Sequence, residues 1–120
     1  MKLSICTVGL LACAVGCAST PPPTAKVAST QTAVQSARAE GAAGVPDAQP
    51  YLTKAEDQLG KAHGLMKKGD NDEAAALLTR AEADAQLATA LTHEAKQNAA
   101  TIAAEQRLRT MSPTLEPTSR

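Results

Sequence analysis

A glycine followed by two acidic residues at capping distance divides the middle of this sequence into two arms. Gly69 closes a run of apolar periodicity that ends in two lysines, which suits the left-handed position after a helix. Asp70 lies three residues before Glu73, the spacing at which each side chain reaches the backbone amide of the other residue. One helix therefore ends and the next begins within about two residues, which predicts an antiparallel helical hairpin.

Apolar residues on both arms recur at steps of three and four, as they do on one face of a helix. The first stripe consists of Leu52, Ala55, Leu59, Ala62 and Met66, and the second of Leu77, Leu78, Ala81, Ala85, Ala88, Leu91 and Ala95. We expect the two stripes to face each other. Strands are not favoured, because no stretch alternates over several residues and β-branched and aromatic residues are scarce.

The predicted fold class is all-α: a small up-down-up three-helix bundle centred on the hairpin, with a long C-terminal helix. Helices are expected over residues 24–40, 47–68 and 71–109, with a break containing glycine and proline at residues 41–46. The first helix is the weakest, because its apolar stripe is narrow and threonines dilute its helix propensity. The alternative arrangement places the first two helices end to end along the third, because their summed length nearly matches it.

The third helix is about 58 Å long at 1.5 Å per residue, against about 33 Å for its hairpin partner. Its end beyond Lys96 therefore overhangs. The overhang carries Ile102 and the i,i+4 pair Glu105 and Arg109, and it is either a solvated, frayed helix or a contact between copies. The helical domain is expected over residues 25–110, and the remaining residues, with two prolines, are expected to form a disordered tail.

From residue 18 onward the sequence contains 24 alanines, no tryptophan or phenylalanine, and a single aromatic residue, Tyr51. Alanine has the highest helix propensity but buries far less apolar surface than leucine or phenylalanine. We therefore expect a domain of marginal stability, or one that a partner stabilises. The formal net charge is +0, and the sequence predicts no concentrated basic face for nucleic acid.

The first 16 residues have the pattern of an export signal peptide. Lys2 precedes an uncharged apolar stretch at residues 3–15, whose helical length of about 20 Å is too short to cross a hydrocarbon core of about 30 Å. The stretch ends in AVGC at residues 14–17, which resembles the lipobox of bacterial lipoproteins. The resemblance implies cleavage before Cys17 and attachment of fatty acyl chains, such as palmitate, to that residue.

Two other interpretations of this region stay open: a rival lipobox that ends at Cys13, and an ordinary secretory peptide with an incidental cysteine. Cys17 is preferred, because Cys13 leaves a very short apolar stretch and because a proline-rich segment, expected to be a tether over residues 17–24, follows Cys17. Ala18 stands where aspartate favours inner-membrane retention in enteric bacteria. The expected location is therefore the periplasmic face of the outer membrane.

Several features of the domain follow one another in order: AEGA at residues 39–42, Pro50, Ala55 and Leu59, the turn at residues 69–74, and RAEADA at residues 80–85. This order resembles a family of bacterial lipoproteins with a short alanine-rich helical domain of unknown function, of the kind often associated with OmpA-like proteins. The resemblance implies no catalytic residues. The hairpin also looks like one tetratricopeptide unit, but such repeats need about three copies to bury a core.

No enzyme active site, cofactor motif or metal site is predicted. His63 and His93 lie on different arms and are interpreted as solvated, because a zinc site needs three or four ligands. We expect a membrane-anchored periplasmic lipoprotein that acts as a non-catalytic helical structural or interaction module, with an envelope protein or another copy of itself as partner. The alternative is a carrier or ligand-binding lipoprotein, which needs a pocket lined by large apolar residues that this composition lacks. Covalent attachment to the cell wall ranks third, because the sequence ends in Arg120 and not in lysine.

Overall fold

The computed structural model describes residues 20–111, which form helices and the turns between them. The elements are α1 (Thr24–Ala39), a short 3₁₀ turn η1 (Ala42–Gly44), α2 (Gln49–Lys68) and α3 (Asn71–Met111). No strand occurs within these residues, and the three α-helices pack together, so the predicted fold class is confirmed. Every helix boundary lies within two residues of its expected position. The predicted signal peptide, Cys13, Cys17 and the predicted tail from residue 112 lie outside the described residues.

The helix ends follow from local sequence. Pro23 precedes α1, and Pro50 stands in the first turn of α2, where a missing amide proton is tolerated. α1 ends next to Gly41 and α2 ends at Gly69, and these glycines have φ angles of 90° and 86°. Because side chains disfavour such left-handed angles, glycine lets the chain reverse direction at both places.

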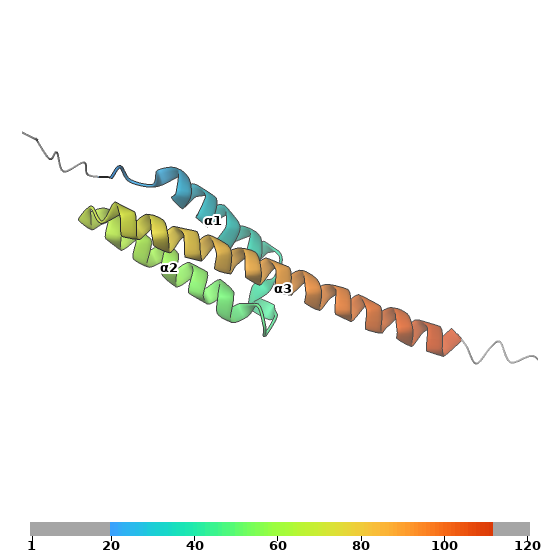
Figure 1. The fold of residues 1–120 in the computed structure, drawn as a ribbon. Coiled ribbons are helices and arrows are strands. Elements are labelled where there is room, and N and C mark those ends of the chain that lie inside the picture. The colour runs from blue at the N-terminus through green and yellow to red at the C-terminus, as the bar shows by residue number, and fades with distance from the viewer. Residues whose placement is uncertain (1–19, 112–120) are drawn as a thin grey trace, which may run out of the picture.

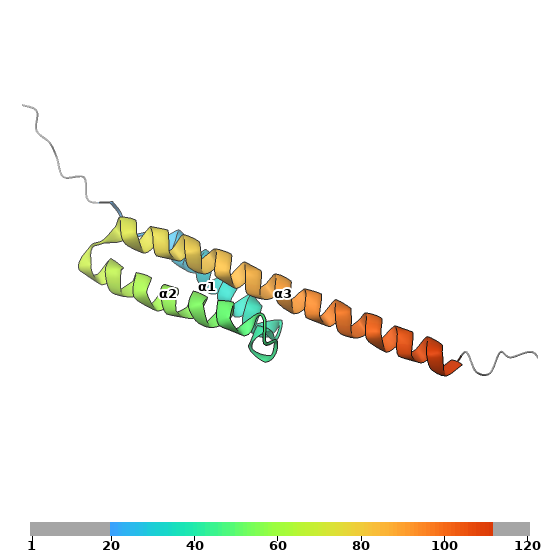
Figure 2. The ribbon, with the colours of Figure 1, turned by 60° about the horizontal axis from the view of Figure 1, so that its bottom comes forward.

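The three helices run up, down and up: α1 and α3 point the same way, and α2 runs antiparallel to both (Figures 1 and 2). Lys26 of α1 forms an ion pair of 3.1 Å with Glu82 of α3. Lys54 of α2 forms one of 3.2 Å with Asp84, only two residues along α3. Both shorter helices therefore lie beside the same part of α3, and the alternative with α1 and α2 end to end is wrong.

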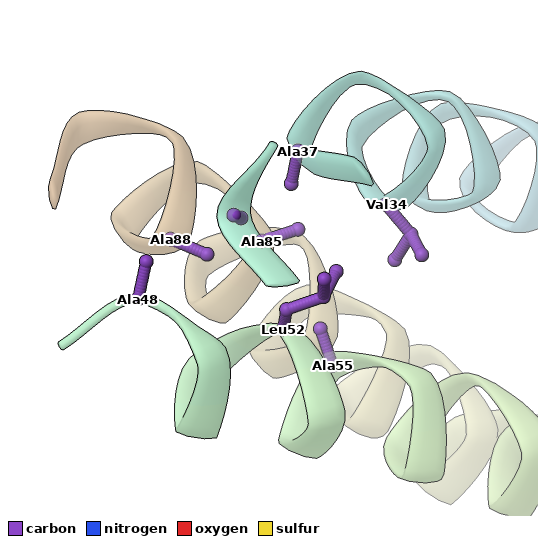
Figure 3. Close-up of a cluster of buried hydrophobic side chains, with 8 residues drawn as sticks. Val34, Ala37, Ala48, Leu52, Ala55, Ala85 and Ala88 are labelled. Atoms are coloured by element: carbon purple, nitrogen blue, oxygen red, sulfur yellow. The ribbon is translucent and has the colours of Figure 1, made fainter. Parts of the chain in front are cut away.

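The core is built mainly from alanine. Its larger cluster brings together all three helices near the η1 turn: Val34, Ala37, Ala42, Ala48, Leu52, Ala55, Ala85 and Ala88 (Figure 3). A smaller cluster at the other end of the hairpin contains Ala62, Ala74 and Leu78. Leu78 is the largest fully buried side chain, so the small apolar area expected from the composition is also what the packing shows.

Polar side chains occupy several core positions. Thr30 of α1 is fully buried, and its hydroxyl lies 2.8 Å from the carbonyl oxygen of Lys26 and 3.2 Å from that of Leu78 in α3. Gln58 of α2 donates a hydrogen bond of 2.9 Å to Asp84. Because a buried polar group without a partner is destabilising, these bonds fix which faces of α1 and α2 meet α3. Thr30 is therefore a packing residue as well as a weak helix former.

Candidate functional site

The buried residues of α3 recur at steps of three and four: Asn71, Ala74, Leu78, Ala81, Ala85, Ala88 and Thr92. Such steps form a seven-residue repeat, the pattern by which a helix presents one line of side chains to its neighbours. We call this line the α3 seam. Over these residues α1 and α2 cover it (Figure 1).

The seam continues past the end of the bundle. Its next positions are Ala95, Ala99 and Ile102, and the repeat then reaches polar Gln106 and Arg109. Ala95 is partly buried, Ala99 is exposed and the side chain of Ile102 is 55% exposed. The line of small and apolar residues therefore continues to Ile102 in the sequence, while its burial stops after Ala95.

The covering helices end where α3 passes the η1 turn. Glu40 follows α1, and its carboxylate oxygen Oε2 lies 3.4 Å from Nζ of Lys96 and 3.4 Å from Nε2 of His93 in α3. Beyond this cluster α3 runs on alone to Met111 (Figures 1 and 2). We call residues 97–111 the α3 extension. It is continuously helical, and in a single chain all of its side chains except partly buried Ala103 are exposed.

A second surface feature is an open groove between α1 and α2, with a volume of about 410 Å³. Its lining consists of Gln31, Val34, Gln35, Arg38, Glu56, Leu59, Gly60 and His63. Arg38 donates a hydrogen bond of 2.6 Å to Glu56, and this bond together with the charge attraction raises the pKa of the Arg38 guanidinium. Only Val34 and Leu59 offer large apolar surface, so the groove lacks the apolar lining typical of a carrier site.

The hairpin turn holds the three residues expected there. Gly69 has φ 86°, and its amide donates to the carbonyl oxygen of Met66. The carbonyl oxygen of Asp70 accepts the amide of Ala74 at 3.0 Å, which places Asp70 at the N-cap position of α3. Capping of first-turn amides by the carboxylates of Asp70 and Glu73 stays a prediction.

Residues 25–107 match the family described as "Domain of unknown function (DUF4398)". The chain belongs to this family. The match runs through all three helices and includes residues 97–107 of the α3 extension, so most of the extension is part of the family's domain. No curated protein and no solved structure matches the chain.

Thr20, the first described residue, contacts the DUF4398 domain at its hairpin-turn end. Asn71, the first residue of α3, is buried, and its side-chain amide donates a hydrogen bond of 2.6 Å to the carbonyl oxygen of Thr20. The described part of the expected tether therefore lies against the domain at Thr20. Sequence reasoning missed this contact, because an asparagine beside a turn is read most simply as a capping residue.

The histidines of the DUF4398 domain lie apart. His63 lines the groove between α1 and α2, whereas His93 is exposed beside Glu40. Within residues 20–111, no group of three or more histidine, cysteine or acidic side chains could hold a metal ion. In the same residues, no helix combines the length and apolar character needed to cross a membrane.

Proposed function

We propose that the protein is a lipid-anchored helical interaction module of a bacterial cell envelope, without catalytic activity. Acyl chains on Cys17 hold it at the periplasmic face of the outer membrane, and the α3 extension is the surface that it offers to a partner. The observation that carries the proposal is the α3 seam, which continues as an uncovered helix face within the segment matched to the family.

The membrane anchor is supported by the sequence around Cys17. A box of small residues ends an apolar stretch that is too short to span a bilayer, and a proline-rich segment follows it. One acyl chain binds a membrane reversibly, whereas two or more make the attachment stable, since each buried methylene group contributes about 0.8 kcal/mol. Lipidation of Cys17 would therefore keep the domain at the surface.

The position of Thr20 supports an orientation in which the hairpin-turn end of the domain faces the lipid. Cys17 precedes Thr20 by three residues, a reach of at most about 10 Å, and Thr20 is bonded to Asn71 at the start of α3. The hairpin turn would then lie near the membrane. The α3 extension begins at the opposite end of the bundle, about 39 Å along α3 from Asn71 at 1.5 Å per residue, so it would be clear of the anchor.

Anchoring is tested with the variants Cys17→Ser and Cys13→Ser in the full chain, each fractionated and assayed for labelled fatty acid. We expect Cys17→Ser to lose the label and leave the membrane fraction, and Cys13→Ser to keep both. Retention of the label by Cys17→Ser, with its loss in Cys13→Ser, would move the anchor to the rival site. Retention in both single variants and loss in the double variant would contradict a single anchor.

The interaction role is tested in cells with a photo-crosslinking amino acid at Ala99, on the α3 extension. The matched control places it at Gln86, which is exposed on α3 inside the bundle. We expect a discrete crosslinked product from Ala99 and none from Gln86. No product from Ala99 would contradict an interaction module that works through this surface.

A further inference from the structure

We propose that the start of α3 is a docking site for the chain's own N-terminal segment, and that Asn71 is the residue that holds it. The occupant is residues 18–20, which connect the proposed anchor at Cys17 to the three prolines at residues 21–23. Docking makes the anchored chain leave the domain at α3 and not at the start of α1. In its consequence for the membrane, the inference rests on the proposed function.

The side chain of Asn71 makes the observed half of this contact. It belongs to a residue that is only 8% exposed, and its Nδ2 donates a hydrogen bond of 2.6 Å to the carbonyl oxygen of Thr20, 51 positions away in the sequence. The backbone amide of Asn71 donates separately to the carbonyl oxygen of Gly69 at 2.9 Å. The side chain is therefore not occupied in its own turn and contacts the N-terminal segment instead.

The oxygen of the same side chain is a second, independent sign of a docking site. Oδ1 of Asn71 is buried and has no hydrogen-bond partner within residues 20–111. A buried acceptor without a donor is destabilising, so folded proteins rarely leave one unpaired. Prolines have no N–H group, so among residues 18–23 only the first three carry a backbone donor for this oxygen. The unpaired atom thus calls for the stretch of chain next to Thr20.

The three prolines join the docking site to α1 with little freedom. α1 and α3 begin at the same end of the bundle, so a short stretch can bridge their starts (Figure 1). Pro23 has φ −79° and ψ 56°, and the amide of Thr24 donates to the carbonyl oxygen of Pro22 at 2.9 Å, which makes an inverse γ-turn before α1. Because proline rings fix φ, these residues lose little conformational entropy when Thr20 docks. One side chain is therefore enough to hold the segment.

Docking shortens the free connection between the anchor and the domain. The three residues from Cys17 to Thr20 reach at most about 10 Å, whereas the seven residues from Cys17 to Thr24 reach about 24 Å. The hairpin turn stays close to the lipid while the segment is docked, and release lets the domain move outward by up to about 14 Å. Asn71 is thus a positioning residue that sets how far the α3 extension stands from the membrane.

The test replaces Asn71 in the full chain and uses Asn98, the only other asparagine of the sequence, as the matched control. Asn71→Asp keeps the shape of the side chain but removes the donor to Thr20, and Asn71→Ser is too short to reach it while it still suits a helix start. Asn98→Asp and Asn98→Ser make the same changes at an exposed position of the α3 extension. Circular dichroism checks that all four variants keep the folded bundle.

Release is measured by ¹⁵N relaxation of the Thr20 amide in the full chain in detergent micelles, a measurement that does not need the acyl chains. The parent chain and both Asn98 variants should give an order parameter near about 0.85, and both Asn71 variants should fall toward about 0.6. The loss of one hydrogen bond lowers the ratio of docked to released chains by about tenfold. At least one amide of residues 18–20 should also exchange more slowly in the parent chain than in the Asn71 variants.

The effect on reach is measured separately, on the lipidated chain in vesicles of phosphatidylethanolamine and phosphatidylglycerol. A fluorescent donor is attached through Gln86→Cys, at an exposed position of α3 inside the bundle, and the vesicles carry acceptor lipids. We expect energy transfer to fall when Asn71→Asp is added, because the released domain stands farther from the lipid. Adding Asn98→Asp should leave energy transfer unchanged.

Three results would overturn the inference. An ordered Thr20 in both Asn71 variants would show that Asn71 does not hold the segment, and an equal loss of order in the Asn98 variants would show that the effect is not specific to the docking site. Lower order without a change in energy transfer would reject the positioning role. Absence of fatty acid on Cys17 would contradict the proposed function instead, while an order of Thr20 that depends on Asn71 would still support the docking site.

Discussion

The first part of α3 and the α3 extension belong to one uninterrupted helix and follow the same repeat, yet the seam is buried only in the first part. Alanine is abundant in both parts, so local propensity supports helix throughout. Burial depends instead on α1 and α2, which stop at the η1 turn. Helix formation and packing are thus separable in this protein, since one sequence pattern makes a core where partners are present and an open face where they are absent.

The comparison predicts very different outcomes for two truncations of aliphatic side chains on α3. Leu78→Ala removes the largest fully buried side chain and should lower the free energy of unfolding by about 3–5 kcal/mol. Ile102→Ala should change the unfolding free energy of the bundle by less than about 0.5 kcal/mol, because the side chain is mostly exposed. Urea denaturation followed by circular dichroism measures both. Similar losses would show that the extension is packed within the single chain.

A second prediction concerns glycines that look alike in the sequence. Gly69→Ala should cost about 1–2 kcal/mol, because φ is 86° there and the turn that pairs α2 with α3 becomes strained. Gly64→Ala lies inside α2 with nothing within 4 Å of the added methyl group, and it should stabilise the bundle by about 0.8–1 kcal/mol. Thermal melts of the two variants should shift in opposite directions. A loss of stability at Gly64 would indicate that a partner approaches α2 closely.

The hairpin turn also allows a test of capping at the start of α3. Asp70→Ala should lower the unfolding free energy by about 1 kcal/mol, because first-turn amides lose an acceptor. The control Asp72→Ala removes a carboxylate from the first turn itself and should cost only about 0.3–1 kcal/mol through the helix dipole. Equal melting temperatures for Asp70→Ala and the parent chain would show that Asp70 does not cap α3 through its side chain.

The smallest effect is expected from removal of the extension. Ending the chain after Lys96 should leave the unfolding free energy of the bundle within about 0.5 kcal/mol of the parent value, because residues 97–111, the described part of what is removed, are exposed except for partly buried Ala103. At low concentration in detergent, the shortened chain and the parent chain should therefore have the same melting temperature. A large drop would make the extension part of the folding unit and would contradict the comparison.

The hairpin could be predicted because several independent cues coincide at one place. Gly69, the capping spacing from Asp70 to Glu73 and the apolar steps on both arms all indicate the same turn. Positions on the α3 seam were less predictable. Leu77 and Leu91 were expected on the buried stripe but are only partly buried, while Asn71 and Thr92 are buried. In a helix rich in alanine every face has some apolar character, so geometry decides burial more than polarity does.

The packing of α1 was the least accessible to sequence reasoning. Thr30 dilutes helix propensity, and only its hydrogen bond to the carbonyl oxygen of Leu78 shows why a threonine suits the contact. That bond joins residues 48 positions apart, and no local pattern encodes it. The overhang of α3 was predicted from lengths alone. The sequence could not predict whether this overhang is solvated or forms an interface between copies, because the same residues fit both.

The division of α3 into a covered and an uncovered part is tested most directly by amide hydrogen exchange along this helix. The measurement uses the full Ile102→Lys chain, because a charge on the exposed continuation of the seam disfavours the packing of any other helix there. Amides from Leu78 to Ala88 should exchange slowly, near the rate of global unfolding, and protection should fall sharply beyond Lys96. Protection that stays uniform from Leu78 to Arg109 in this variant would contradict the account.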